Sequence, residues 1–312
     1  MESTFEQNDV VYNLVPSPRF SQDGVCFLGR ASGLYRSSDG CATWQDALAS
    51  LGLTQRLAVT SVALSPDFAT DQRMLAGVFG GVLHSEDGGL HWGTFLFEKP
   101  EPLVSCLAVS PAYSQDGTAW VGTLDDGIYL TRSHGSRWAA WNFGLFDPHV
   151  LALAVSPDFS KDQVVYAATE TGIFISRNAG RSWQMTSFPT EAAPVTCLGI
   201  SPGFGRDGIL LAGTEEGELY GSPDRGKSWA RKRSFQDTIG GLILAPNFST
   251  LPGILVLSGV ELWFSTDGGT SWEGWKTNLP AGLEPAAVAV PYGLQDDTRL
   301  LVAGSNGQVL QV

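Results

Sequence analysis

Acidic residues recur in the short polar segments that separate the apolar runs of the chain. Five of them are candidates for one acidic rim: Asp125, Asp126, Glu170, Glu215 and Glu216. Two carboxyl groups on either side of a sugar can cleave a glycosidic bond, one as the acid and the other as the nucleophile or base. The alternative is that these are solvated turn residues that favour solubility. Because Asp125 and Asp126 are adjacent in the sequence, we expect their side chains to diverge.

Other residues that could do chemistry lack the spacing of a reactive site. The four histidines, His84, His91, His134 and His149, show no metal-ligand spacing. One aspartate recurs in most of the proline-containing turns, as at Asp23, Asp71, Asp116, Asp162 and Asp207, but Ca²⁺ takes about six to eight oxygen ligands. No glycine-rich segment precedes a helix, as a phosphate-binding loop requires. We therefore expect no catalytic residues, no metal and no cofactor.

A second recurring pattern is S/T-x-D-x-G-x-x-W, which appears six times. Its acidic or amide positions are Asp39, Asp87, Asn178, Asp224 and Asp267, with Ser133 in the third copy, and its tryptophans are Trp44, Trp92, Trp138, Trp183, Trp229 and Trp272. The aspartate oxygens can accept backbone N–H bonds and close a turn, and the glycine permits a backbone conformation that other residues resist. The tryptophan can bury a large face. The pattern therefore predicts a structural hairpin turn.

The elements that position these turns repeat along the whole chain. A proline followed by an aromatic residue recurs at Pro18, Pro66, Pro111, Pro157, Pro202, Pro246 and Pro291. Seven copies at a nearly constant spacing of about 45 residues indicate a repeat architecture. Each unit has the pattern of four strands. Small residues such as Ala108 and Gly199 occur in the first strand, as expected where strands converge on an axis.

The repeat predicts an all-β protein, a single seven-bladed β-propeller of four-stranded blades spanning residues 1–312. The expected blades are approximately 10–59, 60–103, 104–149, 150–194, 195–237, 238–285, and 286–312 together with 1–9. The last unit ends before an outer strand. We expect residues 4–7 to supply that strand and to close the ring.

These repeats resemble those of the Asp-box (BNR) propeller family, which includes sialidases, Vps10/sortilin propellers, xyloglucan-active hydrolases and the Ycf48 photosystem assembly factors. The resemblance spans essentially the whole chain. It implies the fold and the turn role of the aspartates, and the family includes enzymes, receptors and chaperones. Cys41 replaces the usual glycine in the first copy. The sialidase pattern is missing, because no Arg-Ile-Pro segment lies near the N-terminus.

Composition excludes several classes of function. The formal net charge is −13 and the pI is about 4.6, which disfavours nucleic acid as a partner. The N-terminal residues lack a signal-peptide pattern, and no apolar run of about 18 residues predicts membrane insertion. The four cysteines form no CxxC motif and are expected to be small buried residues. We therefore expect a cytoplasmic, soluble protein.

Two surface features are candidates for partner binding. Five basic residues fall between Arg225 and Arg233, among them Arg231, Lys232 and Arg233. They could dock an acidic partner or protect an outer strand. Aromatic residues concentrate at Phe95, Phe97, Trp141, Phe143 and Phe146, where they form either an exposed apolar patch or packing between blades.

The sequence thus favours a non-catalytic scaffold or assembly factor that binds another protein. The motivation is a complete propeller without a converging catalytic set. The alternative is a glycan-binding module or glycoside hydrolase that uses the acidic rim.

Overall fold

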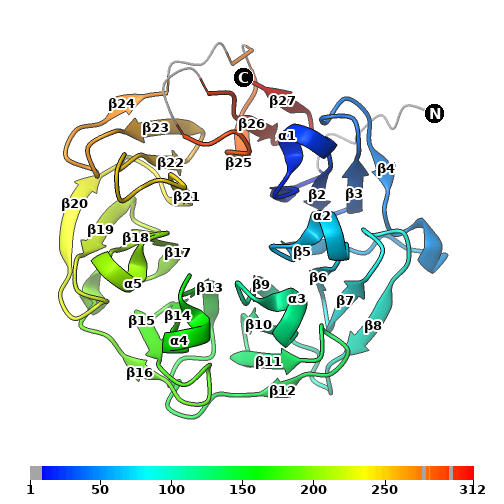
Figure 1. Ribbon diagram of the computed structural model, residues 1–312, viewed down its shortest axis with the longest axis horizontal. Coiled ribbons are helices and arrows are strands. Elements are labelled where there is room, and N and C mark those ends of the chain that lie inside the picture. Colours follow the sequence, from blue (N-terminus) through cyan, green and yellow to red (C-terminus); the bar gives the residue numbers. More distant parts are fainter. Residues whose placement is uncertain (1–8, 276–278, 281, 295–297) are drawn as a thin grey trace.

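The chain forms seven antiparallel sheets arranged as blades around a central axis (Figure 1). The computed structural model describes residues 9–275, 279–280, 282–294 and 298–312. Within them, six sheets have four strands and the last has three. The predicted seven-bladed propeller is therefore confirmed. The predicted closing strand at residues 4–7 lies outside the described residues.

In each blade the strands run from the axis outward in chain order, and we call them a, b, c and d. The first four blades comprise β1 (Val11–Pro16), α1 (Phe20–Asp23), β2 (Cys26–Arg30), β3 (Gly33–Ser37) and β4 (Gln45–Asp46); β5 (Val59–Leu64), α2 (Phe68–Asp71), β6 (Met74–Val78), β7 (Gly81–Ser85) and β8 (Gly93–Leu96); β9 (Val104–Val109), α3 (Tyr113–Asp116), β10 (Thr118–Thr123), β11 (Ile128–Arg132) and β12 (Ala139–Ala140); and β13 (Val150–Val155), α4 (Phe159–Asp162), β14 (Val165–Thr169), β15 (Ile173–Ser176) and β16 (Gln184–Met185).

The last three blades follow the same order. They comprise β17 (Val195–Ile200), α5 (Phe204–Asp207), β18 (Leu210–Thr214), β19 (Glu218–Ser222) and β20 (Ala230–Ser234); β21 (Ile239–Leu244), β22 (Ile254–Ser258), β23 (Glu261–Ser265) and β24 (Glu273–Gly274); and β25 (Pro285–Ala289), β26 (Leu301–Gly304) and β27 (Val309–Gln311). Two 3₁₀ turns, η1 (Ala49–Leu51) and η2 (Thr190–Ala192), lie between blades. Within the described residues no helix is long enough to cross a bilayer.

A bulge in the innermost strand places side chains that can hydrogen-bond to the neighbouring blade. In each a–b pair the register skips one residue near the start of strand a, such as Thr60, Ser105 and Thr196. The hydroxyls of these three residues donate to a carbonyl of the next blade, at 2.6 Å to Val104, 2.5 Å to Val150 and 2.7 Å to Ile239. A bulge re-aims a side chain that would otherwise lie in the pleat. Blades 2, 3 and 5 are therefore each joined to the next blade near the axis by a specific hydrogen bond.

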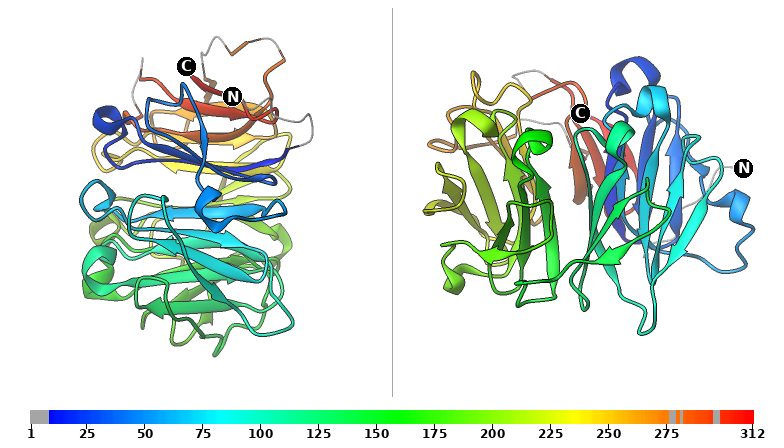
Figure 2. Two further views of the ribbon diagram at one scale, coloured as in Figure 1. Left: turned by 90° about the vertical axis from the view of Figure 1, so that its right-hand side faces the viewer. Right: turned by 60° about the horizontal axis from the view of Figure 1, so that its bottom comes forward.

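The a–b connections differ from the simple turns expected from the sequence. Five of them contain a single helical turn that ends in a left-handed residue, and Figure 2 shows these turns along one rim. The aspartate at the end of each turn closes it. Asp71, for example, accepts the Ser65 hydroxyl at 2.6 Å and the Arg73 N–H at 3.0 Å. These side-chain bonds replace the backbone bonds that a longer helix would supply.

The c–d connections lie on the same rim and contain the S/T-x-D-x-G-x-x-W segments. In the last complete copy, Asp267 accepts the Ser265 hydroxyl at 2.9 Å, the Thr270 N–H at 3.0 Å and the Ser271 N–H at 2.8 Å. Hydrogen bonds from the Ser271 N–H and hydroxyl lower the pKa of Asp267 to about 2. The ionised side chain thus organises the turn, as the sequence predicts for this residue type.

Cys41 occupies the usual glycine position in the first of these turns. Its φ is 72°, close to the 85° of Gly89 in the next blade. Both residues donate their N–H to the hydroxyl of the serine that starts the segment, Ser37 and Ser85 respectively. The turn is therefore the same despite the substitution, and Cys41 is held in a conformation that disfavours a side chain.

Blades 1 and 7 meet through an apolar junction. Leu14 and Leu28 of blade 1 pack in one cluster with Leu301 of blade 7, which fixes the first and last described parts of the chain to each other. In blade 1 a fully buried Arg30 forms an ion pair with Asp9, which lies shortly before β1, at 3.0 Å.

Candidate functional site

The five acidic residues lie on the rim opposite the short helices, in the b–c turns of three consecutive blades. Asp125 and Asp126 follow β10, Glu170 follows β14, and Glu215 and Glu216 follow β18. All five are exposed. Each of these three blades thus contributes its own solvated acidic turn. The described pockets are lined by other residues.

Two of the acidic residues have local partners. Asp126 accepts the hydroxyl of Tyr129, and the Glu170 carboxylate lies 3.9 Å from the His149 ring. Over the described ranges no three His, Cys, Asp or Glu side chains gather as metal ligands. The rim therefore presents a diffuse negative charge, which can attract cations or a basic surface.

The five aromatic candidates separate into buried and exposed residues. Phe97 is only 6% exposed, and its ring packs against Phe95 and Tyr129, with centroids 5.5 and 4.3 Å away. The expectation of an exposed patch is therefore wrong for Phe97, because it fills the space between blades 2 and 3. Phe95 and Trp141 are half-buried.

Phe143 and Phe146 are the exposed members of the set, at 80% and 84%. They belong to the segment 141–149, which leaves blade 3 and passes along the outer edge of blade 4 (Figure 1). The Trp183 backbone N–H donates to the Phe143 carbonyl at 2.8 Å, and its indole N–H donates to the Trp141 carbonyl at 2.8 Å. The segment is thus attached to blade 4 while both phenyl rings remain in water.

The basic residues are held mainly by local interactions. Arg231 forms an ion pair with Glu218 at 2.6 Å. The Arg233 guanidinium lies 4.6 Å from the centre of the Trp263 ring. Lys232 differs, because its ammonium group donates to the backbone carbonyl of Gly268, in blade 6, at 2.9 Å. Its side chain therefore spans the junction between blades 5 and 6.

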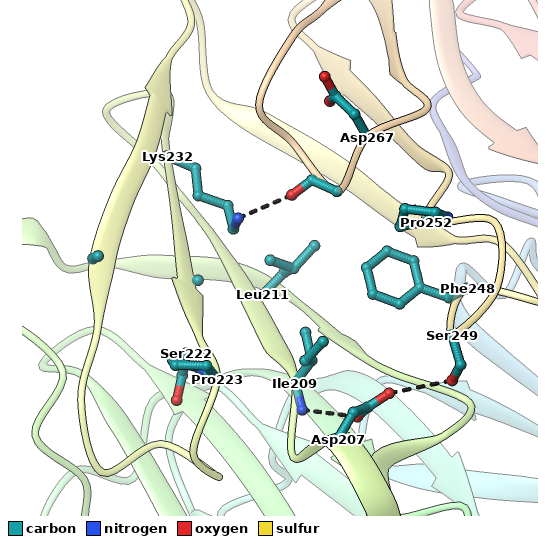
Figure 3. A pocket seen from close by; sticks show the side chains of 13 residues that line it. Asp207, Ile209, Leu211, Ser222, Pro223, Lys232, Phe248, Ser249, Pro252 and Asp267 are labelled. Carbon is teal, nitrogen blue, oxygen red and sulfur yellow. Dashed lines mark hydrogen bonds between the residues drawn. The ribbon is translucent and has the colours of Figure 1, made fainter.

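Beneath Lys232 lies a groove of about 510 Å³ between blades 5 and 6, on the rim of the c–d turns (Figure 3). Ile209 and Leu211 form one apolar wall, and Phe248 and Pro252 form the other. The groove has the size and apolar character of a small ligand site or of a pocket for one large side chain.

Two carboxylates also belong to the groove wall, and both are engaged within their own turns. Asp207 accepts the Ser201 hydroxyl at 2.6 Å and the Ile209 N–H at 3.0 Å. The Asp267 side chain points away from the groove in Figure 3 and binds its own turn. The cationic group at the opening is therefore Lys232.

No protein-family model matches the chain, and no curated protein matches it. Solved structures do. The chain is similar to Ycf48 bound to a D1 peptide, at 19% identity and a TM-score of 0.69, over 99% of this chain and 94% of that one. It is also similar to the GH74 xyloglucanase of Xanthomonas campestris, at 16% identity and a TM-score of 0.71, over 98% of this chain and 52% of that one.

A third similar structure is the extracellular domain of the putative one component system BT4673 from B. thetaiotaomicron. The identity is 14% and the TM-score 0.71, over 100% of this chain and 40% of that one. The chain thus spans about half of the xyloglucanase and less of the sensor domain. At these identities the likeness concerns the fold.

The groove between blades 5 and 6 was not predicted from the sequence, apart from Lys232, Asp267 and the basic segment beside it. A comparison of residue types at equivalent positions of successive blades could have revealed it. Leu211 and Gly221 occupy positions where the preceding blade has Tyr166 and Ile175. An apolar groove bordered by one lysine can bind a large apolar side chain next to an anion.

Proposed function

We propose that this propeller is a non-catalytic scaffold that binds another protein, and that its repeats belong to the Asp-box type. The exposed and anchored aromatic pair Phe143 and Phe146 is the observation on which the scaffold proposal rests. The Asp-box assignment is supported by the recurring bonds of the turn aspartates, such as those of Asp267.

The aromatic pair is costly to leave in water. Exposed apolar surface of this kind marks interaction sites, because its burial against a partner is favourable by about 25 cal/mol per Å². A free loop would lose entropy on binding. The segment here is already fixed, with Leu145 N–H donating to the Asn142 carbonyl at 2.9 Å and the Asn142 side chain accepting the Ile128 N–H at 2.7 Å. A preorganised aromatic surface binds a partner at a lower entropic cost.

Protein is the partner class that this surface fits best. Aromatic residues dominate the binding energy of protein interfaces. The similar Ycf48 structure contains a bound D1 peptide, which supports the proposal of a protein partner for this chain. The acidic rim, at a net charge of −13 for the whole chain, adds solubility and repels nucleic acid.

The experiment is affinity capture from the native host with quantitative mass spectrometry, using the wild-type chain and the double variant Phe143→Ala, Phe146→Ala. We expect at least one protein to be captured by the wild type and reduced by about tenfold or more with the variant, as for interface hot spots. The binding of that protein is then measured with purified components.

A matched control removes exposed apolar residues elsewhere. Leu90 and Leu251 are 57% and 53% exposed, and the double variant Leu90→Ala, Leu251→Ala should capture the same proteins as the wild type. Equal capture by all three chains would contradict the proposal. Binding on a glycan array, or turnover of chromogenic glycosides, would instead favour a carbohydrate function for the acidic rim.

A further inference from the structure

The groove between blades 5 and 6 results from truncation at a position that usually fills the space between blades. In each of the first six blades one residue of strand b pairs with the small or branched residue of strand a and also borders the next blade. These residues are Phe27, Leu75, Trp120, Tyr166, Leu211 and Leu255. Blade 5 therefore has a leucine directly after two blades with large aromatic residues.

The aromatic residues of blades 3 and 4 bridge to the next blade in the same way. The Trp120 indole N–H donates to the Ala179 carbonyl at 3.2 Å, and the Tyr166 hydroxyl donates to the Arg225 carbonyl at 3.0 Å. Both acceptors lie in the c–d turn of the following blade, directly after the Asn or Asp of that turn. The equivalent acceptor in blade 6 is the Gly268 carbonyl, which Leu211 has no group to bind.

A second truncation widens the same hollow. The residue of strand c paired with this position is Arg36, His84, Leu130, Ile175, Gly221 or Phe264 in the first six blades. Only blade 5 has glycine there. A Cβ on Gly221 would lie 2.4 Å from the Lys232 Cε atom, so the lysine stem lies across the space that a side chain fills in the other blades.

The groove thus lies where Tyr166 places its ring in the preceding junction, and the ammonium group of Lys232 lies at its edge. Lys232 is exposed, and within the described part of the chain it makes no ion pair, its bond to Gly268 being to a neutral carbonyl. Lys227, also exposed, lies in the adjacent turn of blade 5. A carboxylate that approached this edge would therefore meet ammonium groups, against a chain that is otherwise strongly acidic.

We propose that this groove receives an aromatic side chain of a partner polypeptide, with an acidic residue of the same segment paired to Lys232. The ring occupies the space that Tyr166 fills in the preceding junction and contacts Leu211 and Phe248. The carboxylate takes a charge-assisted hydrogen bond from the ammonium group. This inference rests on the proposed protein-binding function and assigns it a second surface, on the rim of the c–d turns.

A polypeptide fits better than a free small molecule because exposed lysines lie at one edge of the groove and beyond it. Lys232 lines the groove and Lys227 lies in the turn before β20, whereas Arg231 is already paired with Glu218. An extended acidic segment can contact this edge on both sides of an inserted ring. Aromatic anchors surrounded by polar contacts are typical of peptide recognition.

The test uses the full chain and three pentapeptides as probes. The first has a central tryptophan between two pairs of glutamates, the second replaces the tryptophan by alanine, and the third replaces the glutamates by lysines. Binding is followed by methyl NMR of the protein. We expect the first peptide to shift the Ile209 and Leu211 methyl signals and to bind about tenfold more tightly than either of the others.

Two variants fill the groove with the residues of the preceding blade, Leu211→Tyr and Gly221→Ile. Each should reduce the affinity for the first peptide by about tenfold or more, and the use of two variants keeps the test valid if one fails to fold. Lys232→Met should weaken binding by about threefold, while the matched control Lys161→Met, at an exposed lysine of blade 4, should leave it unchanged.

Equal affinity for the tryptophan and alanine peptides, or full affinity of both filled variants, would overturn the inference. If indole-3-acetate bound as tightly as the first peptide, the groove would be a small-molecule site and the polypeptide assignment would be wrong. These results are separate from the scaffold proposal, because Phe143 and Phe146 lie at the outer edge of blade 4. A captured partner that depends on those two residues would preserve the scaffold proposal even if the groove bound nothing.

Discussion

The junction between blades 4 and 5 and the junction between blades 5 and 6 are built from the same parts. Each places a strand b residue opposite a c–d turn whose aspartate, Asp224 or Asp267, holds the turn in the same conformation. Tyr166 fills the first junction and binds the carbonyl presented by that turn. In the second junction Leu211 is too short, and Lys232 reaches the equivalent carbonyl across a groove.

The difference shows that the residues that form the strands and turns are distinct from the residues that fill the space between blades. The order of strands and the c–d turns are equivalent on both sides of blade 5, so one junction can lose its filling residue while the ring remains closed. A repeat protein tolerates such a change because each blade mainly contacts its neighbours. The filled junction therefore serves as an internal control for the hollow one.

The largest effect on stability is expected from Tyr166→Leu, which gives the junction between blades 4 and 5 the leucine found at the junction between blades 5 and 6. Tyr166 is fully buried and contacts the Phe204 ring at 6.0 Å between centroids. The variant loses that contact and the hydroxyl bond and leaves a cavity, so the free energy of unfolding should fall by about 2–4 kcal/mol. Urea unfolding followed by tryptophan fluorescence measures the change. A loss below about 1 kcal/mol would mean that the junction relaxes and that its packing is unimportant.

A smaller effect is expected from removing only the donor at each junction. Tyr166→Phe deletes the bond to the Arg225 carbonyl, and Lys232→Met deletes the bond to the Gly268 carbonyl. The tyrosine bond is partly buried and should contribute about 1 kcal/mol, whereas the lysine bond is exposed to water and should contribute less than about 0.5 kcal/mol. Denaturant midpoints of the two variants and the wild type give both values. Equal losses would show that Lys232 is as important to the ring as Tyr166.

The sequence was sufficient to predict the ring because its signals are local and repeated. Each repeat has a turn with a proline and a second turn with an aspartate and a glycine, at nearly fixed spacing. A periodic pattern of this kind survives isolated departures such as Cys41 and Ser133. The one-turn helices were missed because four residues are too few for a helical pattern to appear.

The candidate surfaces were harder to predict because exposure depends on neighbouring blades. Phe97 and Phe146 are alike in sequence, yet the first packs between two sheets and the second remains in water. The hollow at Leu211 is equally invisible within one repeat, since leucine is an ordinary strand residue. It becomes evident only when the position is compared with Tyr166, in a structure that shows which residues bridge the blades.

Filling the hollow should change stability only slightly. Leu211→Tyr restores the aromatic ring of the preceding blade and can displace Lys232 from Gly268. The added apolar contact and the strain of fitting a larger side chain oppose each other, so we expect a change in the free energy of unfolding of less than about 1 kcal/mol. Urea unfolding measures it beside the peptide titration. A loss above about 2 kcal/mol would indicate that the two junctions differ in backbone spacing as well as in residue type.

The smallest effect should be the same at both junctions, because it concerns the turns that they share. Hydrogen bonds to their carboxylates, first those from Ser228 and Ser271, lower the pKa of Asp224 and Asp267, the latter from 3.8 to about 2. A carboxylate whose pKa is lower in the folded state stabilises the protein above its unfolded pKa, and this contribution is lost as the pH falls toward 2. Asn178 shows that an amide fits such a turn, since its side-chain oxygen accepts the Ser182 N–H at 2.9 Å.

Asp224→Asn and Asp267→Asn should therefore each lower stability slightly at neutral pH, and the difference from the wild type should shrink as the pH falls; for Asp267 it should vanish below about pH 2. Unfolding midpoints measured between pH 2 and 7 at one ionic strength, over the range where the folded state persists, follow this convergence. Parallel profiles would show that the turns are independent of what fills the space beside them. A larger loss of stability for Asp267→Asn would mean that the unfilled groove makes its turn more dependent on the carboxylate. Such a dependence is expected there because Gly268, whose carbonyl binds Lys232, directly follows that aspartate.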